Sequence, residues 1–125
     1  MCSVRSGGST YAVFRRVLDR GDLAAVRAAA GDLPAPPPLE DALAICLLLL
    51  EQEPDSYERG AVRWLGRLLL ERRSARLRQA ELAAAYLTAL AEPTRRDAAA
   101  QALAELGNGL GLPRLNDRIV DRRDR

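Results

Sequence analysis

The chain has 125 residues, a formal net charge of +2 and no histidine. Its length suits one domain with a core, and its 48% apolar and 29% charged content is typical of a globular protein rather than a disordered one. Without histidine it lacks the commonest general base and metal ligand, and two cysteines, Cys2 and Cys46, are too few for a Cys/His zinc site. We therefore expect no catalytic site, no cofactor and no metal.

Composition also decides the fold class. Alanine and leucine contribute 22 residues each, whereas valine, isoleucine and threonine together contribute 11. Alanine and leucine are strong helix formers, and strands favour the β-branched and aromatic residues that are scarce here. The sequence therefore predicts an all-α protein of six to seven helices.

The N-terminal part of the chain is expected to form a helical hairpin. Residues 1–9 are rich in serine and glycine and predict a flexible leader without the apolar core of a signal peptide. The hairpin spans residues 10–31, with helices over 11–20 and 23–30. Residues 32–38 contain four prolines and predict a stiff, extended linker; a proline-rich ligand for another domain is the alternative.

The helical main body is expected over residues 39–121, followed by a charged tail at 122–125, within one domain overall. Prolines 54, 93 and 113 interrupt the helical pattern. Helices are therefore predicted over 39–53, from Asp55 or Ser56 to 73, and over 75–91, 95–106 and 114–121. The side chains expected to cap helices are Thr10, Asp22, Asp55 or Ser56, Ser74 and Thr94.

The first helix of the main body is apolar on every face, with a charge-free run of nine residues from Ala42 to Leu50. Such a helix must be packed on several sides, and nine residues are too few to span a bilayer. The next helix is expected to turn an apolar stripe toward the core, made of Ala61, Val62, Trp64, Leu65, Leu68 and Leu69.

A weak internal repeat appears at a shift of 39 residues. It aligns Glu53-Pro54 with Glu92-Pro93, and the core position Trp64 with Leu103. Each unit would be two antiparallel helices with a proline at the bend, which resembles a HEAT- or armadillo-type helical repeat. A short α-solenoid and a plain antiparallel helical bundle are both open, and both bury the same residues.

A further likeness rests on the string DALAICLLLLEQEPDSYERGAVRWLGRLLLE and the alanine-rich LAAAYLTAL that follows it. Over residues 39–106 the chain resembles small all-helical proteins of high-GC actinobacteria, and all 19 of its basic residues are arginine, which is typical of a GC-rich genome. The resemblance implies an all-helical fold and a cytoplasmic location. It transfers no functional residue, because proteins of this type have no assigned chemistry.

Charge is unevenly distributed along the middle of the chain. Residues 40–58 hold six acidic residues and no arginine, whereas residues 59–78 hold seven arginines and a single glutamate. Arg59, Arg63 and Arg67 recur every four residues and form one stripe on a helix, where like charges repel by about 0.2–0.5 kcal/mol per pair. This repulsion must be offset in one of two ways. The first is internal ion pairs, with acidic residues of the preceding helix or one turn further on. The second is an external anion.

We predict that Arg59, Arg63 and Arg67 bind another protein, and that the chain is a non-catalytic helical interaction or adaptor protein of the cytoplasm. Helical repeats present groove-like binding surfaces, which favours this class by analogy. The alternative is a nucleic-acid-associated regulator that uses the basic segment Arg59–Arg78. A near-neutral net charge and only five aromatic residues argue against that alternative. No membrane partner is expected.

Overall fold

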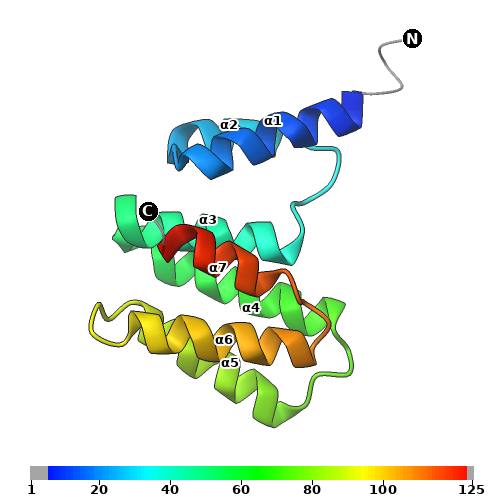
Figure 1. Cartoon of the computed structure of the whole chain (residues 1–125). Helices are drawn as coiled ribbons and strands as arrows, with labels where there is room; N and C mark the ends of the chain where they lie inside the picture. The colour runs from blue at the N-terminus through cyan, green and yellow to red at the C-terminus, as the bar shows by residue number, and fades with distance from the viewer. Residues whose placement is uncertain (1–5, 124–125) are drawn as a thin grey trace. The chain divides into compact units, whose positions relative to one another are not determined.

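A computed structural model of the chain describes residues 6–123 (Figure 1). This part of the chain forms seven α-helices and a short 3-10 helix, with no strand, and the all-α prediction is confirmed. The chain divides into two compact units, Met1–Pro38 and Leu39–Arg125, called here the N-terminal unit and the main unit.

The N-terminal unit is a helical hairpin of α1 (Ser6–Arg20) and α2 (Leu23–Gly31). The chain reverses at Gly21, whose φ of 78° lies in the left-handed region that glycine adopts without strain. Asp22 caps α2, because its carboxylate accepts a hydrogen bond of 3.2 Å from the backbone N–H of Ala25. This predicted cap is confirmed.

The predicted start of the first helix is wrong. Helix α1 begins at Ser6, so Thr10 lies inside the helix and does not cap it. Adding residues to an existing helix is far easier than nucleating one, so poor helix formers can extend its first turn. Of the expected leader, residues 6–9 are therefore helical, and residues 1–5 lie outside the described part of the chain.

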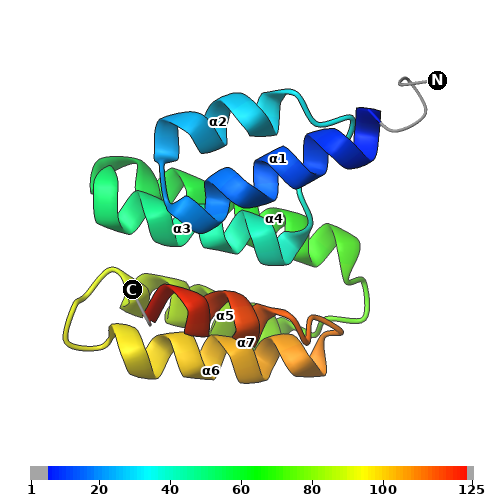
Figure 2. The same cartoon turned by 45° about the horizontal axis from the view of Figure 1, so that its top comes forward.

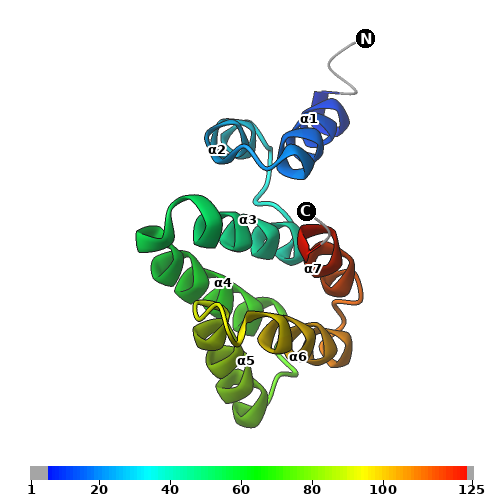
Figure 3. The same ribbon diagram turned by 60° about the vertical axis from the view of Figure 1, so that its left-hand side comes forward.

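The main unit contains five α-helices and one 3-10 turn. Their bounds are α3 (Leu39–Gln52), η2 (Pro54–Ser56), α4 (Tyr57–Glu71), α5 (Leu77–Leu90), α6 (Arg96–Gly109) and α7 (Leu115–Arg123). Consecutive helices pack against one another, as the series α5, α6 and α7 shows in Figure 2. Helix α7 returns to pack against α3 (Figure 3). The helices thus form a bundle around one shared core.

Helix α3 is the most deeply buried element of the main unit. Its buried apolar residues are Leu39, Leu43, Ala44, Cys46, Leu47, Leu48 and Leu49. Two side chains from other helices also bind its first turn. The indole Nε1 of Trp64 donates a hydrogen bond of 2.8 Å to the carbonyl oxygen of Leu39, and Arg118 of α7 forms a buried ion pair with Asp41. The prediction that Trp64 is a core residue is confirmed, since its side chain is only 3% exposed.

Three predicted caps of the main unit are wrong. Ser56 donates its hydroxyl hydrogen bond to Glu53, and α4 instead follows directly from η2, whose Pro54 carbonyl accepts from the N–H of Tyr57. The α5 helix starts after Arg76, whose N–H donates to the Gln79 side chain at 2.8 Å, so Ser74 lies outside the helix. No side-chain cap precedes α6, which starts after Arg95 rather than Thr94.

Gly107, near the end of α6, serves packing rather than helix termination. The helix was expected to stop at residue 106, but it continues to Gly109. A Cβ atom at Gly107 would lie 2.7 Å from a methyl group of Leu115, so this glycine allows α7 to approach α6 closely. The chain leaves the helix at Gly111, which has a φ of 81°.

Two residues of the predicted apolar stripe on α4 do not face the core. Val62 is 65% exposed and Leu69 is 37% exposed, whereas Ala61, Trp64 and Leu68 are buried as expected. The apolar stripe of α4 is therefore wider than the surface that α3 and α5 cover.

The bond between Trp64 and Leu39 gives a first testable prediction. Trp64→Ala should lower the free energy of unfolding by about 3–5 kcal/mol, because it empties a large buried site. Trp64→Phe keeps most of the apolar surface and removes only the indole donor, so it should cost about 1–3 kcal/mol. Urea denaturation followed by circular dichroism measures both. Equal stability of the alanine variant and the wild type would contradict this packing.

Candidate functional site

Helix α4 positions the predicted arginine stripe. Tyr57, Ala61, Trp64 and Leu68 recur every three or four residues and bury one face of the helix in the core. Residues on the opposite face must then point to solvent. The arginines at positions 59 and 63 lie there, and both are exposed.

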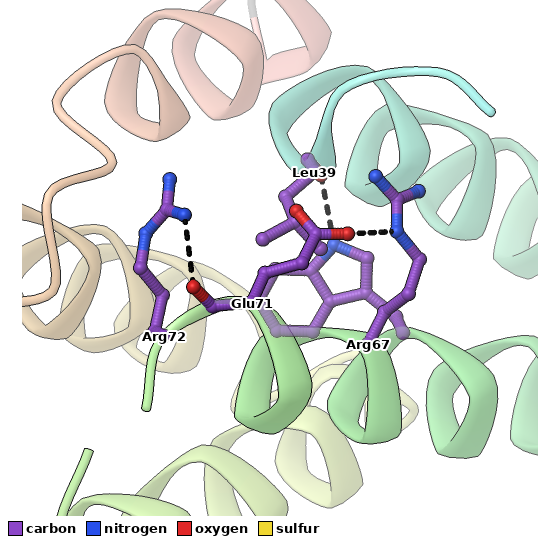
Figure 4. Close-up of polar contacts among 5 residues, drawn as sticks. Leu39, Arg67, Glu71 and Arg72 are labelled. Atoms are coloured by element: carbon purple, nitrogen blue, oxygen red, sulfur yellow. Dashed lines mark hydrogen bonds and ion pairs between the residues drawn. The ribbon is translucent and has the colours of Figure 1, made fainter. Parts of the chain in front are cut away.

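Within the described residues, the side chain of one arginine of the stripe has an ionic partner and those of the other two have none. The Arg67 guanidinium pairs with the Glu71 carboxylate one turn further along α4, with 2.6 Å between Nε and Oε2 (Figure 4). Arg59 and Arg63 form no ion pair or hydrogen bond through their side chains with any residue in the range 6–123. The structure therefore assigns one arginine of the stripe to an internal pair and leaves two facing solvent.

The acidic segment before α4 does not neutralise Arg59 and Arg63. Asp41 pairs with Arg118 on the other side of α3, and Glu53 accepts a hydrogen bond from Ser56. Like charges four residues apart on a helix repel, so these two arginines slightly destabilise the isolated helix.

Exposed apolar residues lie among these arginines. Val62 is 65% exposed and Leu70 is 75% exposed, and Gly66 lies midway between them on α4. A Cβ atom at Gly66 would meet no atom within 4 Å, so packing inside the described chain does not require a glycine there. A mid-helix glycine is about 1 kcal/mol less favourable than alanine. We call Arg59, Val62, Arg63, Gly66 and Leu70 the α4 face.

An open groove runs between α4 and α5 beside this face. It has a volume of about 320 Å³. Its walls are mostly apolar but include one acidic side chain. From α4 they contain Glu58, Ala61, Val62 and Leu65, and from α5 and its C-terminal cap Ala84, Thr88 and Ala91. At its floor the Tyr57 hydroxyl donates a hydrogen bond of 2.6 Å to the carbonyl oxygen of Leu87, which holds the two helices at a fixed spacing.

A second basic area follows α4 at the connection to α5. Arg72 donates from Nε to the carbonyl oxygen of Leu110 at 2.9 Å, so it ties this connection to the turn after α6. Arg73 and Arg78 are exposed. The predicted basic segment Arg59–Arg78 is thus spread over α4, the connection and α5 rather than gathered on one helix face.

The buried polar groups near the groove are held in their neutral forms. Burial raises the pKa of the Cys46 thiol to about 12, so the thiolate needed for nucleophilic chemistry does not form near neutral pH. Burial also raises the pKa of the Tyr57 hydroxyl. The nearby Cys46 raises this pKa further, whereas Arg96 lowers it in part. Tyr57 therefore remains a hydrogen-bond donor at the groove floor.

Within residues 6–123, no three acidic or cysteine side chains come close enough together to hold a metal ion. No helix in the same range combines the length and apolar character needed to cross a bilayer. Comparisons with protein-family models, with curated proteins and with solved structures found no match to the chain. The residues themselves must therefore carry the functional argument.

Sequence reasoning found the arginines but missed Val62, Leu70 and the groove. The available signal was the excess width of the apolar stripe on α4, which covers more positions than one packing face needs. Which edge of that stripe stays uncovered depends on the spacing of α4 and α5, and no local pattern encodes that spacing.

Because only Arg67 of the stripe forms an ion pair within the described residues, removing the three arginines should have a small effect on the stability of the fold. Replacing Arg59, Arg63 and Arg67 together by alanine should change the free energy of unfolding by less than about 0.5 kcal/mol, because an exposed i,i+4 pair contributes about 0.3–0.5 kcal/mol and the removed repulsion offsets it. Thermal and urea denaturation measure this. As a control, Arg118→Ala should cost about 3–5 kcal/mol, since it removes the guanidinium that pairs with the buried carboxylate of Asp41. A similar loss in the triple variant would assign the whole stripe to internal ion pairs.

Proposed function

We propose that the chain is a non-catalytic interaction or adaptor protein of the cytoplasm that binds another protein through the α4 face. The observation that carries this proposal is the position of Arg59 and Arg63, which have no ionic partner in the described chain and flank the exposed side chain of Val62. Basic and apolar groups that share one face suit a surface that is both acidic and apolar.

Physical chemistry supports a protein as the partner. A guanidinium binds a carboxylate through two parallel hydrogen bonds, so Arg59 and Arg63 suit aspartate or glutamate side chains. Exposed apolar side chains such as Val62 and Leu70 stabilise a complex when the partner removes them from water. Arginine is also enriched among the interface residues that dominate binding energy.

Nucleic acid is the second candidate, and the arginines after α4 favour it. Arg73 and Arg78 are exposed and no acidic residue separates them in the sequence, which gives a local positive surface. Phosphate binding, however, makes no use of the apolar groove or of Leu70. Binding to random-sequence DNA or RNA that falls steeply with salt would support this candidate over the first.

Affinity capture tests the proposed function. The tagged full chain is crosslinked in cells that express it naturally, treated with nuclease and purified. We expect a partner protein to be recovered with the wild type and lost, by at least tenfold, with Arg59, Arg63 and Arg67 changed to alanine. Arg16→Ala/Arg20→Ala is the matched control, since it removes two exposed arginines at the same spacing from α1.

Two results would contradict the proposal. Equal recovery with the triple variant and the control variant would show that the α4 face does not bind the partner. Loss of the partner on nuclease treatment would show that nucleic acid bridges the two proteins, and would favour the second candidate.

A further inference from the structure

The connection between α4 and α5 lies beside the turn between α6 and α7, at one end of the main unit (Figure 2). The Nε atom of Arg72 donates a hydrogen bond of 2.9 Å to the carbonyl oxygen of Leu110 and so joins the two segments. The backbone N–H of Ala75 donates to the carbonyl oxygen of Arg72 and closes a turn within the connection. Residues 72–78 and 110–114 therefore lie side by side, although they are far apart in the sequence.

This end of the main unit is strongly basic. The two segments contain five arginines and no acidic residue. Of these, four are exposed: Arg73, Arg76, Arg78 and Arg114. The nearest acidic residues in the sequence lie in the adjoining helices, at Glu71, Glu81, Glu105 and Asp117, and Glu71 pairs with Arg67. Four exposed guanidinium groups thus share one end of the unit with no acidic group between them in either segment.

Two exposed leucines flank the same connection. Leu70, in the last turn of α4, is 75% exposed, and Leu77, the first residue of α5, is 79% exposed. They are the most exposed large apolar side chains in the part of the chain that the structure describes. Basic and apolar groups are therefore presented to solvent together at this end of the unit.

We propose that this end of the main unit binds the surface of a bilayer that contains anionic phospholipids. The surface, called here the basic end, consists of Leu70, Arg73, Arg76, Leu77, Arg78 and Arg114. Its guanidinium groups pair with lipid phosphates, and its two leucines enter the layer beneath the headgroups. The expectation of no membrane partner rests on the lack of a sequence long enough to span a bilayer, and binding at the surface needs no such sequence.

A bilayer suits the basic end better than nucleic acid or protein does. A nucleic acid would pair with the arginines and leave Leu70 and Leu77 in water. A protein would have to offer a shaped cavity to each leucine, and the two leucines come from different helices. Acyl chains rearrange around an apolar side chain that protrudes, so a bilayer can use the arginines and the leucines together.

Vesicle binding tests the proposal. The full chain is sedimented with vesicles of phosphatidylcholine alone, and with vesicles of phosphatidylcholine and phosphatidylglycerol in equal parts. We expect at least tenfold tighter binding to the anionic vesicles, and weaker binding as the salt concentration rises, because salt screens the attraction to the arginines. No binding to the anionic vesicles, or equal binding to both kinds, would overturn the proposal.

A pair of double variants tests the arginines. Arg73→Ser/Arg78→Ser should weaken binding to the anionic vesicles at least tenfold. Arg16→Ser/Arg20→Ser makes the same change of charge on α1, also at exposed positions, and should weaken binding less than threefold. Equal effects of the two double variants would show that net charge determines binding and would overturn the assignment to the basic end.

Leu77 tests the apolar contribution. Leu77→Ser should weaken vesicle binding at least fivefold, whereas Val13→Ser, which changes an exposed apolar residue of α1, should leave it unchanged. Leu77→Trp reports insertion, since Trp64 is buried and only the new indole is exposed. Its fluorescence should shift to shorter wavelength with anionic vesicles. Binding without that shift would show that the leucine stays in water and would overturn the proposal.

The basic end shares only Leu70 with the α4 face, so this inference stands apart from the proposed function. Recovery of a partner protein through Arg59 and Arg63 neither requires nor excludes vesicle binding. Binding to random-sequence DNA without binding to anionic vesicles would assign the arginines of the basic end to nucleic acid and overturn the inference.

Discussion

The burial of α3 on several sides is the constraint on which the main unit depends. This helix is apolar around its whole circumference, so no single neighbour can cover it. Helices α4 and α7 both pack against it, and Trp64 and Arg118 bind its first turn at Leu39 and Asp41. Once one face of α4 is committed to α3, the opposite face must point to solvent. Arg59, Val62 and Arg63 of α4 are therefore exposed because of the way α4 packs against α3.

Much of the fold could be predicted because the relevant information is local. Alanine and leucine content indicates helices, proline marks the interruptions, and the apolar run of α3 indicates a central helix. Helix ends were harder, because they depend on contacts between elements. Gly107 looks like a terminator in the sequence, yet it lies within α6 because Leu115 of α7 packs against it. The aligned core positions Trp64 and Leu103 are both buried, as a repeat and a plain bundle alike require.

The candidate site was only partly accessible from sequence. A four-residue spacing is enough to place Arg59, Arg63 and Arg67 on one helix stripe, and also to place Glu71 one turn beyond Arg67. The spacing alone does not decide which arginine pairs internally, since the acidic segment before α4 was an equal candidate. In the structure, Asp41 of that segment pairs with Arg118 instead. The groove was not predictable, because it depends on how far α5 lies from α4, which the bond from Tyr57 to Leu87 helps to fix.

The most direct test of this account is to map the bound surface on the full chain by ¹⁵N–¹H NMR, with the partner recovered by affinity capture as the titrant. The account predicts that the largest chemical-shift changes cluster on the α4 face, at Arg59, Val62, Gly66 and Leu70. Changes confined to α1, α2 or α6, with α4 and α5 unaffected, would contradict it.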